Sequence, residues 1–94
     1  MKLSTSPKLG GPVRLVGLGK LEKGEKGLII RVGNVGFSME IVQRLMEMGF
    51  LEGTSVEVLH LSPFGGDPIV VRVRGSLIAL RRNEANAIEV LLNE

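Results

Sequence analysis

The glycines of the central segment, with the apolar alternation between them, constrain this chain more than any other feature. Gly49 and Gly53 precede the run 55–61 (SVEVLHL), and Gly65-Gly66 separates that run from 69–74 (IVVRVR). Glycine adopts the positive φ angles of tight turns without steric cost. Alternation of apolar and other residues is the period of a half-buried strand. The segment therefore predicts short strands joined by sharp turns.

The composition fits one small folded domain. The chain has 94 residues, of which 44% are hydrophobic, and it has no cysteine. The lack of cysteine excludes disulfides, thiolate nucleophiles and cysteine-rich zinc sites. The first residues lack the apolar stretch of a signal peptide, and no apolar run approaches the roughly 20 residues of a membrane span. We therefore expect a soluble, cytoplasmic protein.

Charge is distributed unevenly along the chain. Residues 1–33 carry seven Lys/Arg against two Glu, whereas residues 34–94 carry five Arg against eight Asp/Glu. A basic N-terminal third can contact nucleic acid or an acidic protein face, but a solvated leader is the simpler interpretation. We expect a flexible basic leader over residues 1–17. Within it, residues 13–16 either form an edge strand or extend the leader.

The spacing predicts one amphipathic helix over about 38–48. Ser38 is a suitable N-cap, and Gly49 is the expected left-handed residue that closes the helix. The polar residues recur at the i, i+3, i+4, i+7 spacing of a single helix face. They are Glu40, Gln43, Arg44 and Glu47.

The order of the remaining elements predicts a mainly β fold. Strands are expected at 26–32, 55–61, 69–74, 77–81 and 88–90, with a tight link at Gly75-Ser76 and a short helical turn at 82–87. This order is that of a small SH3-like β-barrel over residues 18–94, with the helix inserted after its first strand. The residues expected to contribute most to the core are Val56, Val58, Ile69, Val71, Val73, Leu80, Ile88 and Val90.

The chain offers little for catalysis or metal binding. His60 is the one histidine, and it lies between two leucines with no nucleophile signature around it. Transition-metal sites recruit several imidazoles or thiolates, so we expect no tight metal site within one chain. A weak or intersubunit site that uses His60 stays open. Gly33-Asn34-Val35-Gly36 precedes the helix but lacks the Lys-Ser/Thr of a nucleotide-binding loop. We predict no catalytic, cofactor-binding or metal-ligating residues.

Two recognition functions are disfavoured by the scarcity of aromatic residues. The chain has three phenylalanines and no tyrosine or tryptophan. Single-strand nucleic-acid binders use aromatic stacking platforms, and proline-rich ligands require an aromatic-lined groove. Arg72, Arg74, Arg81 and Arg82 still make a basic patch. Nucleic-acid binding is therefore an alternative but not the preferred function.

Protein–protein contact is the function that the residues favour. Phe64 lies in a long loop between Pro63 and Gly65, where it either presents an apolar anchor or folds back over the barrel end. The helix methionines either seal the barrel or receive a partner. The predicted partner-contact residues are Pro63, Phe64, Asp67 and Met46.

An ordered set of residues resembles the ferrous-iron transport protein A (FeoA) family across about 18–90. The set begins with Leu18-x-x-Leu21-x-x-Gly24-Glu25 and Arg44-Leu45-x-x-Met48-Gly49-x-x-x-Gly53, and continues through Val56-x-Val58, Pro63 and Gly66-Asp67-Pro68-Ile69. It ends with Val71-x-Val73-x-Gly75, Ala79-Leu80-Arg81 and Ala85-x-x-Ile88-x-Val90. Glu52 departs from the family, in which many members have proline before the glycine.

The resemblance implies a non-enzymatic cytosolic accessory protein of bacterial ferrous-iron uptake. Family members are thought to act with a large iron permease that carries a G-protein domain, so that permease is the implied partner. The fold is similar to the C-terminal domain of metal-dependent repressors of the DtxR type. The resemblance therefore leaves one alternative, a metal-responsive regulatory domain with a weak transition-metal site. Homo-oligomerisation also stays open.

Overall fold

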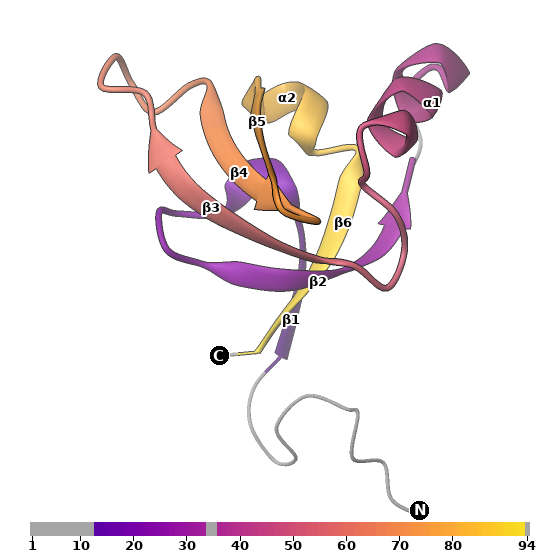
Figure 1. The fold of residues 1–94 in the computed structure, drawn as a ribbon, viewed down its shortest axis with the longest axis horizontal. Helices are drawn as coiled ribbons and strands as arrows, with labels where there is room; N and C mark the ends of the chain where they lie inside the picture. The colour runs from indigo at the N-terminus through magenta and orange to yellow at the C-terminus, as the bar shows by residue number, and fades with distance from the viewer. Residues whose placement is uncertain (1–12, 34–35, 94) are drawn as a thin grey trace, which may run out of the picture.

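The computed structural model describes residues 13–33 and 36–93, which form one six-stranded antiparallel sheet with two α-helices and a 3₁₀ helix (Figure 1). The strands adjoin in the order β1-β6-β2-β3-β4-β5. The mainly β fold with an inserted helix is confirmed. In chain order the elements are β1 (Val13–Gly17), η1 (Leu18–Lys20), β2 (Lys26–Val32), α1 (Met39–Glu47), β3 (Ser55–Leu61), β4 (Ile69–Val73), β5 (Ser76–Leu80), α2 (Arg82–Ala85) and β6 (Ile88–Asn93).

The curved sheet encloses a single apolar core. All eight residues expected in the core are buried, because the alternating pattern of each strand turns every second side chain inward. Leu18, the first residue of η1, Leu21, its C-cap, and Phe50, after α1, are fully buried as well. Large apolar side chains from loops and from η1 therefore complete the core of the barrel.

Helix α1 begins and ends where its capping residues predict. The Ile41 N–H donates to Ser38 Oγ (3.2 Å) at the N-terminus. At the C-terminus Gly49 has a φ of 110°. The Gly49 N–H donates to the Met46 carbonyl (3.0 Å), and the Phe50 N–H donates to the Leu45 carbonyl (3.1 Å). These two bonds form a Schellman motif. Among the described residues, no helix has the length and apolar character that a membrane crossing requires.

The turn between β4 and β5 lies one residue earlier than expected. Arg74 (φ 52°) and Gly75 (φ 82°) are its two central residues, and Val73 pairs with Ser76. A two-residue hairpin turn with positive φ at both positions matches the twist of the flanking strands. Arg74 therefore belongs to the turn and not to the strand, and β5 begins at Ser76 instead of residue 77.

The C-terminal elements differ in length from the expected ones. The helical turn expected over 82–87 is the four-residue α2, and the strand expected over 88–90 continues to Asn93 as β6. Strand β6 is longer because it lies between β1 and β2 and pairs with both. These long-range pairings extend the strand beyond its local apolar pattern.

Strand β1 changes the N-terminal limit of the sheet. Residues 13–17 pair in register with β6 along their whole length, and Val16 packs against the core. Of the two alternatives for 13–16, the edge strand is the one observed. Residues 13–17 of the leader expected over 1–17 therefore belong to the sheet, because β6 supplies them with a pairing partner. Residues 1–12 lie outside the described part of the chain.

Candidate partner-contact surface

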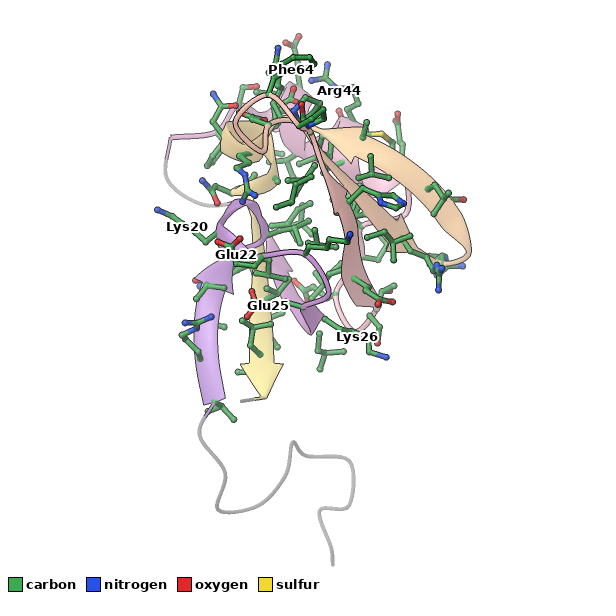
Figure 2. All side chains as sticks on the ribbon, turned by 90° about the vertical axis from the view of Figure 1, so that its left-hand side faces the viewer. Lys20, Glu22, Glu25, Lys26, Arg44 and Phe64 are labelled. Carbon is green, nitrogen blue, oxygen red and sulfur yellow. The ribbon has the colours of Figure 1, made fainter. Side chains whose placement is uncertain are left out.

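One end of the barrel carries the loop that joins β3 to β4, helix α2 and helix α1 (Figure 1). The loop and α1 rise on opposite sides of this end, with α2 between them, and β1 begins at the other end of the molecule. Figure 2, turned by 90°, shows Phe64 of the loop and Arg44 of α1 at the same end. We call this the contact end.

Phe64 is the most exposed large apolar side chain described, with 88% of its surface accessible. The ring points away from the barrel, so the fold-back alternative is wrong. Its backbone is nevertheless fixed, because the Phe64 N–H donates to Ser62 Oγ (3.1 Å) and the Gly66 N–H donates to the Ser62 carbonyl (2.8 Å). Pro63, before it, is exposed too. The loop therefore presents an apolar ring from an ordered backbone.

Arg82, the first residue of α2, holds the base of this loop. Its Nε donates to the Gly66 carbonyl (2.8 Å), and its Nη1 donates to the carbonyls of Gly19 (2.6 Å) and Leu21 (3.0 Å). The approach of η1 to α2 is close: a Cβ at Gly19 would lie 2.1 Å from the Arg82 carbonyl oxygen. One guanidinium thus joins the β3–β4 loop, α2 and η1. We call these bonds the Arg82 cluster.

Asp67, a predicted contact residue, belongs to the same arrangement. It is partly buried, and its Oδ1 accepts a hydrogen bond from the Arg82 backbone N–H (3.0 Å). That bond satisfies a free N–H at the start of α2. Asp67 therefore positions the loop relative to α2, whereas Pro63 and Phe64 form its outer surface.

Helix α1 divides its apolar residues between the core and the solvent. Val42 and Leu45 are buried, and Met48 packs against the core. Met39 (74% accessible) and Met46 (43%) face outward, so the helix both seals the barrel and keeps adaptable apolar side chains available. An ion pair between Arg44 and Glu84 (3.2 Å) links α1 to α2.

A second surface is a shallow hollow on the outer face of β2, β3 and β4. Its lining includes Lys26, Glu57, Arg72 and Arg74. Lys26 lies opposite Glu57, and Glu57 lies opposite Arg72, whose Nη1 is 3.9 Å from the carboxylate. Alternating charges in register stabilise neighbouring strands. Two arginines of the expected basic patch thus have partners within the chain. Arg72 is paired with Glu57, and the Arg82 side chain donates to the carbonyls of its cluster.

His60 is exposed on β3. Over residues 13–33 and 36–93, no three His, Asp or Glu side chains lie close enough to hold a metal ion together. What the contact end offers is an exposed ring, exposed thioethers and a fixed backbone.

Sequence reasoning located the loop and Phe64 but missed the Arg82 cluster. The sequence analysis places Arg82 in a basic patch. Its bonds to Gly19 and Leu21 could not be foreseen, because these residues are more than 60 positions away in the chain. The sequence Gly66-Asp67-Pro68 indicates a turn, but no residue near it in the chain indicates that Arg82 bonds to this turn. Only the packing of η1 against α2 brings these groups together.

The sequence of this chain matches a known family. The model of the FeoA domain matches residues 16–92. The Fe(2+) transport protein A/Fe(2+) transporter FeoB fusion protein of Porphyromonas gingivalis is 35% identical over 75 residues, which are 80% of this chain and 8% of the fusion protein. The putative Fe(2+) transport protein A of Campylobacter jejuni is 32% identical over 75 residues, 80% of this chain and 96% of that protein.

Solved structures agree with the family match. The crystal structure of Stenotrophomonas maltophilia FeoA complexed with zinc, described as an SH3 domain protein, has a TM-score of 0.70 at 31% identity, over 79% of this chain and 87% of that chain. The crystal structure of T. acidophilum IdeR has a TM-score of 0.69 at 24% identity, over 87% of this chain and 36% of that chain, a likeness of fold alone. Because the family model extends from β1 to β6 and the relatives share both sequence and fold, this chain belongs to the FeoA family, whose named relatives are associated with Fe(2+) transport.

Proposed function

We propose that this chain is a non-enzymatic, cytoplasmic accessory protein of ferrous-iron uptake that docks on a FeoB-type permease and modulates it. Support comes from the relative in which a FeoA domain and the FeoB transporter share one polypeptide. Fusion holds two domains at a high effective concentration. In that relative the linkage keeps the FeoA domain close to the transporter. For this chain we propose that a non-covalent contact with a FeoB-type permease takes the place of the linkage.

The observation that carries the proposal is the exposed ring of Phe64 on a fixed loop. An apolar anchor binds most strongly when little conformational entropy is lost on binding. The Ser62 and Arg82 hydrogen bonds order this loop beforehand. Phe64 therefore serves as the anchor, with Pro63 beside it and Met46 of α1 as a second apolar contact across the contact end.

The proposal is tested with the purified full chain and the purified soluble G-protein domain of the FeoB-type permease from the same organism. Isothermal titration calorimetry gives the dissociation constant. We expect Phe64→Ala to weaken binding about 30-fold, since a central anchor contributes about 2 kcal/mol. Leu77→Ala is the matched control: Leu77 is 63% accessible but lies on β5, away from the loop, and its loss leaves the dissociation constant unchanged.

Two results would contradict the proposal in different ways. Binding of Phe64→Ala with unchanged affinity would remove the loop from the contact surface. Absence of binding by the wild-type chain to both the G-protein domain and the full-length permease in detergent would reject docking itself. Circular dichroism of each variant confirms that the barrel is folded.

A further inference from the structure

The terminal strands carry an apolar row on the outer face of the barrel. Leu15 of β1 lies directly opposite Leu91 of β6, and Leu91 lies opposite Leu28 of β2. Their neighbours Val90 and Ile29 are buried in the core, so the three leucines point to the other face. The row therefore crosses three strands in register.

This row is most exposed where it reaches β1. Leu28 is 38% accessible, Leu15 is 50% and Val13, on the same strand, is 52%. Isolated apolar side chains are normal on a surface. Here, however, they are aligned on neighbouring strands and end at an edge, since within the described residues β1 pairs with β6 alone.

The β1 edge has few of the features that prevent strand pairing. Natural edges are protected by charges, proline or bulges. Strand β1 has one charged residue, Arg14, no proline, and a regular register with β6. The other edge, β5, differs on its outer face, because Leu77 lies opposite Arg72 in the row that continues to Glu57. Pairing at β5 would extend a row that mixes Leu77 with the charged Arg72 and Glu57, whereas pairing at β1 would extend a row of leucines.

We propose that two copies of this chain associate through β1, antiparallel about a two-fold axis at Leu15. A two-fold interface is self-complementary, so Leu15 meets Leu15 of the second copy and the leucine rows of both copies join. In this register Arg14 faces Val16 of the second copy. A register centred on Arg14 would place two guanidinium groups opposite each other, which is destabilising.

The interface is small and lies away from the contact end. Five residues of each copy bury less than the ~1,200 Å² at the lower limit of standard interfaces, so we expect a weak dimer that forms only at high protein concentration. Strand β1 begins at the end of the molecule opposite the Phe64 loop (Figure 1). The dimer thus leaves both loops accessible, and the inference does not depend on the proposed function.

Single-cysteine variants of the full chain test the register, since the natural chain has no cysteine. Opposite Cα atoms of antiparallel strands are about 4.5–5.5 Å apart, within the range of a disulfide. Leu15→Cys should therefore form a covalent dimer at 100 µM under mild oxidation at least ten times faster than Val13→Cys. Val13 has nearly the same accessibility, but in the proposed register it faces Gly17, which places the two cysteines too far apart to bridge.

Two further measurements keep the proposal falsifiable. Leu77→Cys, on the other edge, should form disulfide dimers as slowly as Val13→Cys. Equal rates of dimer formation in all three cysteine variants would overturn the proposal. Faster dimer formation by Val13→Cys than by Leu15→Cys would overturn the register. In sedimentation velocity, the average mass of the wild-type chain should rise above 10.1 kDa as its concentration approaches 1 mM. Leu15→Lys should remain at that mass. A wild-type chain that also stays monomeric at 1 mM overturns the dimer.

Discussion

Arg82 joins three segments at the base of the contact end. Its guanidinium donates to carbonyls of Gly66, Gly19 and Leu21, which belong to a loop and to the residues of η1 and its C-cap. The planar fork of arginine offers donors in fixed, divergent directions, whereas the ammonium of lysine is a compact point charge. A lysine at this position cannot serve all three carbonyls, so the loop would keep the bond from the residue-82 N–H to Asp67 but lose part of its side-chain attachment.

We therefore expect Arg82→Lys to lower the free energy of unfolding by about 1–3 kcal/mol, as hydrogen bonds from a charged donor to partly buried carbonyls are lost. Urea denaturation measures the change. The neighbour Arg81 is exposed, and Arg81→Lys should stay within about 0.5 kcal/mol of the wild type. Equal stabilities of the two variants would show that the Arg82 cluster contributes little.

Helix α1 links local sequence signals to the shape of the contact end. Its N-cap, its C-terminal glycine and its apolar spacing are all local, which is why the helix was predictable from sequence. Its buried residues Val42 and Leu45 fix it on the barrel, and the same packing turns Met46 outward. The outward orientation of Met46 thus follows from the burial of Val42 and Leu45.

The N-cap of α1 provides a test at the scale of this element. Ser38→Ala removes the acceptor for the Ile41 N–H and should cost about 1 kcal/mol of unfolding free energy. Ser38→Asp keeps an acceptor and places a negative charge at the positive end of the helix, so it should retain wild-type stability. Thermal unfolding compares the three proteins; an equal loss in both variants would contradict a capping role.

Elements set by long-range pairing were harder to predict than elements set by local pattern. Strands β3 and β4 alternate clearly and appeared within one residue of their expected limits. The limits of β1 and β6 depend on each other, since each supplies the hydrogen-bond partner of the other. The Arg82 cluster depends on η1 meeting α2. The sequence allowed a strand at 13–16, but nothing near that segment or near Arg82 identifies the distant partner.

At the scale of the whole molecule, the barrel separates two surfaces. The contact end displays Phe64 (Figure 2). The outer face of the terminal strands displays the leucine row. The core connects them, because Val16 of β1 packs against the same cluster that receives Leu45 of α1. Strand β1 is therefore structural as well as exposed.

Comparison of a chain that begins at Val13 with one that begins at Leu18 measures the contribution of β1. Loss of five cross-strand pairs and of the Val16 contact should lower the free energy of unfolding by about 2–4 kcal/mol. Urea denaturation of both chains under the same conditions gives the difference. Equal stabilities would instead support a domain that begins at residue 18.

The Arg82 cluster also bears on the order in which the chain folds. Arg82 and Gly19 are 63 residues apart. Contacts between such distant residues form after the intervening chain has been brought together, because closing a long loop costs entropy before any contact rewards it. The bonds to Ser62 lie within the loop, but the loop that carries Phe64 is joined to α2 and η1 only once the first and last parts of the barrel have met. A partner that recognises this loop in its fixed position therefore selects completed barrels over partly folded chains.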